Sequence, residues 1–202
     1  MSPPPEAAAA PPAASAEPSA RERVLVTATQ MFTREGVHGT GINSVIARSG
    51  VAKDTLYKHF PSKQDLVLAV VRRRDQDWLG AMQQQVSVAP ADPAGRLLAV
   101  FDVLDAQLDD PAYLGCLFLT TSTDYPDPEH QVRRASAEHK ARVRAYLTEL
   151  AEHAGVAEPV ALGSGLMLLL DGAICARTTA DDRTAGRRAR QAAAILVTAA
   201  TR

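Results

Sequence analysis

The chain has 202 residues, which fits one domain or two small ones and is enough to bury a substantial core. Its composition, 46% hydrophobic and 22% charged, is that of an ordinary globular protein. The formal net charge of −1 argues against a nucleic-acid-binding protein, although a net charge averages over local patches. Cys116 and Cys175 match no metal-ligand spacing, so we expect neither a disulfide framework nor a bound metal or other cofactor.

The beginning of the chain is dominated by two residue types. Residues 1–20 contain six prolines and eight alanines, and this composition cannot bury enough surface to offset its ordering entropy. We predict a disordered tail over residues 1–19. The same stretch lacks the pattern of a secretory signal, and the longest strongly apolar run, 160–170, is shorter than the ~20 residues of a membrane span. We therefore expect a cytoplasmic protein with no membrane partner.

Charge divides the remainder of the chain. Residues 21–63 carry seven basic and three acidic side chains, a net charge of +4, whereas residues 64–202 sum to −3 and residues 1–20 to −2. A small basic module, placed at residues 20–65, thus precedes a larger acidic one at residues 66–202. This asymmetry indicates a polyanionic partner for the basic module.

The basic module begins with two predicted helices. Apolar residues between Val24 and Phe32 recur on one helical face, and Gly36 can end that helix. Thr40 can serve as the N-cap of a short second helix whose inner face includes Val45.

A tight turn at Gly50 leads into a third predicted helix, Lys53 to Phe60, in which Leu56 and Phe60 face inward. Its outward face is dense in hydrogen-bond donors and acceptors, as contacts to base edges and phosphates require. Pro61 ends this helix, and the sequence from Ser62 to Asp65 approximates a capping box that opens a long fourth helix. Lys63 in its first turn could hold a phosphate together with the free backbone N–H groups.

These residues carry a resemblance to a known family. The segments Met31-Phe32 to Gly36, Ile46-Ala47 to Gly50-Val51, Thr55-Leu56-Tyr57-Lys58-His59-Phe60 and Ser62-Lys63 resemble the DNA-binding domain of the TetR family of transcriptional regulators. The resemblance covers about a quarter of the chain. It implies an all-helical homodimer whose N-terminal helix-turn-helix domain binds operator DNA and whose C-terminal domain binds a small effector that releases it.

The resemblance and the outward face together predict the DNA contacts. They place Thr55, Tyr57, His59 and Lys63 at contact positions, with Lys53, Asp54 and Thr55 reading bases. The full predicted set is Thr40, Asn43, Ser44, Lys53, Asp54, Thr55, Tyr57, Lys58, His59 and Lys63. Two residues depart from the family pattern: Ala52 stands where a capping Ser or Thr is usual, and Asp54 where a small residue is usual.

The larger module is also predicted to be helical. Residues 94–110, 113–124, 128–154, 158–178 and 183–201 read as helices separated by Pro, Gly or Asp, and Asp127-Pro128 favours an N-cap followed by proline at the first helical position. No stretch alternates with period two over a convincing length. The fold class is therefore all-α, with an N-terminal three-helix helix-turn-helix domain and a C-terminal helical domain for ligand binding and dimerisation.

The last two predicted helices would form the four-helix dimer interface that the family uses. Completion of a monomeric core is the alternative. The candidate interface residues are Leu162, Leu166, Leu169, Leu170, Ile174, Ala192, Ile195, Leu196 and Ala199.

An effector pocket in this module would be lined by large apolar groups and a few polar ones. Packing in the core is the alternative role for each candidate. The candidates are Trp78, Met82, Phe101, Leu104, Tyr113, Phe118, His139, Tyr146 and Met167.

No catalytic constellation is found. Three Glu-His pairs are adjacent on predicted helices and so diverge by about 100°, and HExxH is absent. We predict a ligand-responsive, dimeric DNA-binding regulator, most simply a repressor. A helical protein-binding adaptor without DNA affinity, or an all-helical enzyme, is the alternative.

Overall fold

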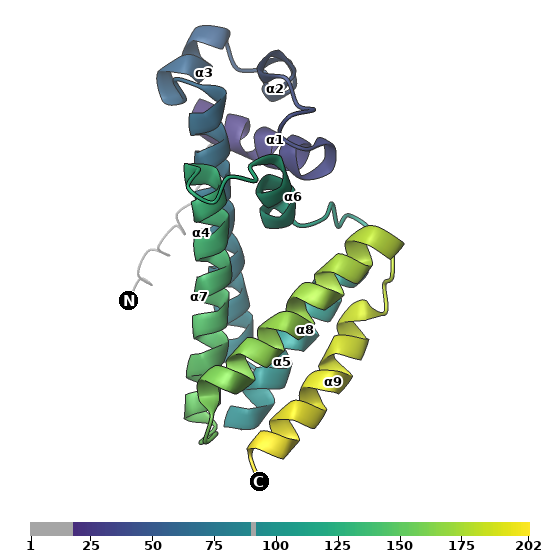
Figure 1. Cartoon of the computed structure of the whole chain (residues 1–202). Coiled ribbons are helices and arrows are strands. Elements are labelled where there is room, and N and C mark those ends of the chain that lie inside the picture. Colours follow the sequence, from purple (N-terminus) through teal and green to yellow (C-terminus); the bar gives the residue numbers. More distant parts are fainter. Residues whose placement is uncertain (1–17, 90–91) are drawn as a thin grey trace, which may run out of the picture.

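The computed structural model describes residues 18–89 and 92–202, and within these ranges it contains nine helices and no strand (Figure 1). This confirms the all-α prediction. Three short helices, α1 (Ala20–Glu35), α2 (Ile42–Ser49) and α3 (Lys53–His59), form a head at one end of the molecule. The others are α4 (Lys63–Ser87), α5 (Pro93–Asp109), α6 (Leu117–Asp124), α7 (Gln131–His153), α8 (Pro159–Ala180) and α9 (Ala185–Ala200).

The long helix α4 belongs to both halves of the molecule. Its first turns pack Leu66 and Val70 into the core of the head, whereas Met82 and Val86 near its other end pack into the core of the body, formed by α5 and α7–α9. The boundary predicted between residues 65 and 66 therefore falls inside one continuous helix. α4 therefore connects the two cores directly.

The body is held together by close helix contacts. α7 packs on α8, and α9 packs on both α5 and α8. A Cβ atom at Gly163 would lie 2.5 Å from Thr148 Oγ1, and one at Gly186 would lie 2.6 Å from the Cα of Asp105, so both crossings need glycine. By length and composition alone α8 could cross a membrane, but here its buried residues face the core of the body.

The second helix begins differently from the prediction. Gly41, not Thr40, is the N-cap of α2, and no side chain caps this helix. The Thr40 side chain is only 1% exposed, and its hydroxyl donates to the carbonyl of Gly36 at 2.7 Å. The hydroxyl closes the turn after α1 instead, so the prediction that Thr40 caps the second helix is wrong.

Two helices, α6 and α7, start later than predicted. Residues 113–116 form a loop before α6, because Gly115 has a φ of 108° that a right-handed helix excludes. α7 starts at Gln131 rather than at residue 128. Asp127 Oδ1 accepts from the N–H of Glu129 in a turn, and His130 Nδ1 accepts from the N–H of Val132 as the actual cap.

The other predicted helix ends lie within two residues of those observed. Ser62 caps α4 as predicted, since its hydroxyl accepts from the N–H of Asp65 at 3.2 Å. Ala52 is the N-cap residue of α3, and its methyl group cannot accept a hydrogen bond from the first turn of the helix. The predicted tail lies outside the described residues except for Pro18 and Ser19, and Ser19 caps α1.

Candidate functional site

The exposed face of α3 is the first candidate site. Leu56 and Phe60 anchor this helix in the core of the head. Gly50, with a φ of 64°, provides the left-handed turn that sets α3 at an angle to α2. Around α3 the exposed side chains are Lys53, Asp54, Tyr57, Lys58 and His59, and Thr55 is half-buried.

The neighbouring helix ends border this face. Asn43 and Ser44 are exposed in the first turn of α2, and Lys63 is the first residue of α4, where backbone N–H groups have no partner within the helix. The guanidinium of Arg21 lies 5.6 Å from the centre of the Phe60 ring, which adds a cation close to the end of α3. Thr40 alone among the predicted contact residues is buried, so its hydroxyl is not available to a phosphate.

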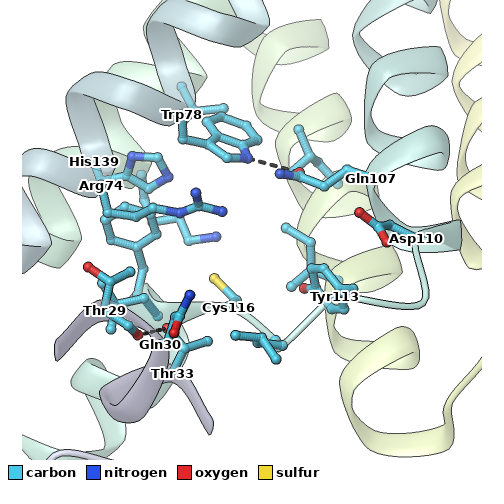
Figure 2. A pocket seen from close by; sticks show the side chains of 18 of the residues that line it. Thr29, Gln30, Thr33, Arg74, Trp78, Gln107, Asp110, Tyr113, Cys116 and His139 are labelled. Carbon is cyan, nitrogen blue, oxygen red and sulfur yellow. Dashed lines mark hydrogen bonds between the residues drawn. The ribbon is translucent and has the colours of Figure 1, made fainter. Parts of the chain in front are cut away.

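The second candidate site is a cavity of about 290 Å³ between the head and the body (Figure 2). It lies where α1, α4, α7 and α8 meet the loop before α6, so both halves of the molecule contribute to its wall. The lining residues are Thr29, Gln30, Thr33, Arg74, Trp78, Gln107, Asp110, Ala112 to Phe118, His139, Lys140, Val143, Met167, Leu170 and Ile174.

Five of the nine residues proposed for a pocket line this cavity: Trp78, Tyr113, Phe118, His139 and Met167. The other four do not. Phe101 and Leu104 are fully buried in the core of the body, Met82 lines a separate hollow, and Tyr146 lies further along α7. The predicted set does not include the polar lining residues Arg74 and Gln107. Helical spacing could indicate Arg74, because it precedes Trp78 by one turn of α4.

The His139 side chain is buried and contacts two aromatic rings and a carboxylate. Its ring stacks on Phe118 with centroids 3.5 Å apart, and Trp78 meets it edge-on at 5.3 Å. Nδ1 lies 2.8 Å from Oδ1 of Asp75, and Arg142 Nη2 donates to Oδ2 of the same carboxylate at 2.6 Å. Burial lowers the pKa of His139 to about 4 in spite of this carboxylate, so the imidazole is neutral at pH 7.

Hydrogen bonds also hold other residues at and behind the cavity wall. Trp78 Nε1 donates to Gln107 Oε1 at 2.9 Å (Figure 2). Arg177 Nε donates to the carbonyl of Leu108 at 2.7 Å. The Arg177 guanidinium also lies 5.4 Å from the centre of the Tyr113 ring. Burial raises the pKa of Tyr113 to about 12, so its phenol stays protonated.

The short helix α6 runs from the cavity to the head. Leu117 and Phe118 at its start line the cavity and pack in the core of the head. Asp124 at its end contacts the turn between α1 and α2 through its carboxylate. One helix therefore touches both the place where a ligand could lie and the turn that positions α2.

The third candidate site is the outer face of α8 and α9. Leu162, Leu166, Leu170 and Ile174 are buried in the chain's own core, so they are not available to a partner and this part of the interface prediction is corrected. Apart from Asp171 and Arg177, apolar and small residues lie on almost every face of α8, so the sequence alone does not show which face is buried. The exposed apolar side chains are Leu168 (73%), Ile195 (71%), Leu196 (40%) and Ala199, with Leu169 and Ala192 partly exposed.

Nothing in the part of the chain that the structure describes resembles a metal centre, since no three His, Cys, Asp or Glu side chains gather there.

Comparison with known proteins finds a family match for each half of the chain. Residues 24–70 match the family "Bacterial regulatory proteins, tetR family", and residues 93–193 match "Tetracyclin repressor-like, C-terminal domain". The crystal structure of a TetR-family transcriptional regulator from Streptomyces coelicolor superposes with a TM-score of 0.85 at 32% identity, covering 91% of this chain and 90% of that one.

Curated relatives agree with these matches. The HTH-type transcriptional regulator YjdC of Escherichia coli is 27% identical over 172 residues, which are 83% of this chain and 90% of that protein. The HTH-type transcriptional activator FasR of Mycolicibacterium smegmatis is 36% identical over 82 residues, 41% of this chain and 37% of that protein.

Proposed function

The chain belongs to the TetR family of helix-turn-helix transcriptional regulators, and from this premise we propose that it is a dimeric, cytoplasmic repressor released from its operator by a small molecule. The family consists of DNA-binding regulators rather than enzymes. Repression, dimerisation and release by a ligand are the parts that we add.

The proposal for DNA contact assigns α3 to the major groove. Lys53, Asp54 and Thr55 at its start would meet base edges, because the N-terminal residues of a recognition helix reach deepest into the groove. Tyr57, Lys58, His59 and Lys63 would contact the backbone and fix the register. Asn43 and Ser44 would join them from α2.

The proposal for dimerisation rests on the exposed apolar face of α8 and α9. Leu168, Ile195 and Leu196 lie on two adjacent helices, and large apolar side chains grouped in this way favour burial against a partner. A two-fold axis through this face would give a four-helix interface and present two copies of α3 to the DNA.

The proposal for ligand release rests on the shared cavity. Thr29, Gln30 and Thr33 of α1 line it together with residues of α4, α7 and α8. A ligand that fills the cavity more favourably when head and body are reoriented would shift the population away from the DNA-binding geometry. This shared lining is the observation that carries the proposal.

The experiment is a gel-shift titration with the promoter region of the chain's own gene, at several salt concentrations. We expect the double variant Tyr57→Ala Lys63→Ala to lose most operator affinity and to show a shallower salt dependence. The control Arg96→Ala removes an exposed cation on α5, outside the head, and should bind as the wild type does. An unchanged affinity and salt slope in the double variant would refute the assignment of the DNA-binding face.

A further inference from the structure

We propose that the cavity between head and body binds a small organic carboxylate with an apolar body, and that Arg74 is the counter-ion of its carboxylate. The inference rests on the proposed ligand site and names the chemical class that the site takes.

Among the described residues, the cations around the cavity are paired with carboxylates, with one exception. Lys140 is held by Asp171, Arg142 by Asp75, and Arg73, next to Arg74, by Glu22 and Asp77. Arg74 pairs with no carboxylate among residues 18–89 and 92–202. Its guanidinium extends into the middle of the cavity below Trp78 (Figure 2).

The cavity itself supplies no anion to Arg74. Asp110 is the only carboxylate residue among those lining it, and it lies exposed at the rim, where Oδ1 accepts from the N–H of Ala112 at 2.7 Å. The aromatic side chains of Trp78 and Phe118 line the same cavity as the guanidinium. A cation in such surroundings is stabilised by an anion, and the planar fork of an arginine matches a carboxylate in two parallel hydrogen bonds.

His139 adds a second element of recognition. Because Nδ1 donates to the Asp75 carboxylate, the neutral ring carries its free lone pair on Nε2, and His139 is one of the residues that line the cavity (Figure 2). This nitrogen accepts a hydrogen bond and brings no charge. A ligand that offers a hydroxyl or N–H group besides its carboxylate is therefore favoured over one that offers the carboxylate alone.

The size of the cavity restricts the ligand further. About 290 Å³ lies at the lower end of the usual range of ligand pockets. The lining combines the aromatic side chains of Trp78, Phe118 and Tyr113 with the aliphatic side chains of Met167 and Ile174. A monocyclic aromatic acid, or a short-chain aliphatic one, fits this lining better than a polycyclic drug or a long acyl chain.

The chain offers a direct readout, because Trp78 is its one tryptophan and lines the cavity. The experiment titrates the full chain with benzoate, para-hydroxybenzoate, phenylacetate and hexanoate, each beside its neutral amide, and follows the fluorescence of Trp78. We expect at least one acid to bind about tenfold more tightly than its amide, and para-hydroxybenzoate to exceed benzoate.

Variants locate the counter-ion. Arg74→Gln should weaken binding of the acid about tenfold or more and leave binding of its amide unaffected. Arg74→Lys keeps the positive charge but not the paired donors of the guanidinium, so its affinity for the acid should lie between those of Arg74→Gln and the wild type. Arg72→Gln removes an exposed cation on the same helix and should bind as the wild type does. Circular dichroism confirms that each variant is folded.

The proposal is overturned if amides bind as well as acids, if no acid binds at millimolar concentration, or if Arg74→Gln binds the acids normally. Because the fluorescence titration needs no DNA, these results are separate from a failure of the gel-shift experiment, which would refute the regulatory function instead.

Discussion

Oδ2 of Asp124 accepts a hydrogen bond from the backbone N–H of Val37 at 2.5 Å, across 87 residues of sequence. Oδ1 of the same carboxylate lies 3.4 Å from His38 Nδ1. Val37 is buried in the turn between α1 and α2, while Asp124 is the last residue of α6, whose first residues line the cavity. A single carboxylate thus fastens the helix that touches the cavity to the turn that positions α2.

Replacing Asp124 by Ala should loosen this connection. We expect a loss of about 1–3 kcal/mol of unfolding free energy, because the N–H of Val37 would lose a charged acceptor. Amide hydrogen exchange at Val37 should accelerate, while amides in the middle of α8 stay protected. Glu129→Ala, an exposed carboxylate in the loop after α6, is the matched control and should leave both values unchanged. Exchange at Val37 at the wild-type rate would show that the connection is unimportant.

His139 predicts a specific pH dependence of stability. Its pKa is lowered from 6.5 to about 4 in the folded chain, so between these values the unfolded chain binds a proton that the folded chain does not. The unfolding free energy should therefore fall by about 3 kcal/mol as the pH drops from 6.5 to 4, with no contribution from His139 above that window.

The measurement is urea unfolding at a series of pH values. His139→Gln should show a shallower fall than the wild type across this window, because the titrating group is gone. His153→Gln, which removes an exposed histidine at the end of the same helix, should keep the wild-type slope. Parallel curves for the wild type and His139→Gln would contradict the assignment.

The missing cap of α3 offers a stabilising substitution. Ala52 has φ −60° and ψ 143°, the extended geometry of an N-cap, but no side-chain oxygen. Ala52→Ser should raise the unfolding free energy by about 1 kcal/mol in urea titrations. Ala47→Ser, at an exposed interior position of α2, should not raise it, since serine is a poorer helix former than alanine. Equal effects at both positions would mean that no cap is formed.

The proposed dimer face can be tested by introducing a charged side chain into it. Leu168→Glu and Ile195→Glu change side chains that are 73% and 71% exposed, so the fold of the chain should be unaffected. In sedimentation equilibrium the wild type should be a dimer and both variants monomers, because a buried unpaired carboxylate is costly. Val88→Glu, 75% exposed after the end of α4, should remain dimeric. A monomeric wild type, or dimeric variants, would refute this interface.

The sequence predicted best what is decided locally. The turn at Gly50, the cap at Ser62 and the inward positions of Leu56 and Phe60 follow from rules that act over four or five residues, and all are observed. The prediction for Thr40 is wrong because its hydroxyl has two possible partners, the backbone N–H groups at the start of α2 and the carbonyl of Gly36. In the folded chain the hydroxyl of Thr40 donates to the carbonyl of Gly36, and the turn after α1 decides which of the two partners it has.

The cavity and the proposed dimer face depend on contacts between distant segments. Which cations near the cavity have a carboxylate partner depends on pairings such as that of Lys140 with Asp171, 31 residues away, and no periodicity reveals these. Arg74 has no such partner within residues 18–89 and 92–202. Likewise α8 is apolar on almost every face, so the outer residue Leu168 cannot be distinguished from its inner neighbours without the contacts of α7 and α9.

The central claim, a dimer that reads operator DNA with two copies of α3, is tested most directly by selecting bound sequences from a random pool of double-stranded DNA with the full chain. The claim predicts enrichment of a palindrome whose half-site centres lie one helical turn, about 34–36 Å, or a multiple of it apart. Enrichment of a single unpaired half-site, or no enrichment at all, would contradict it.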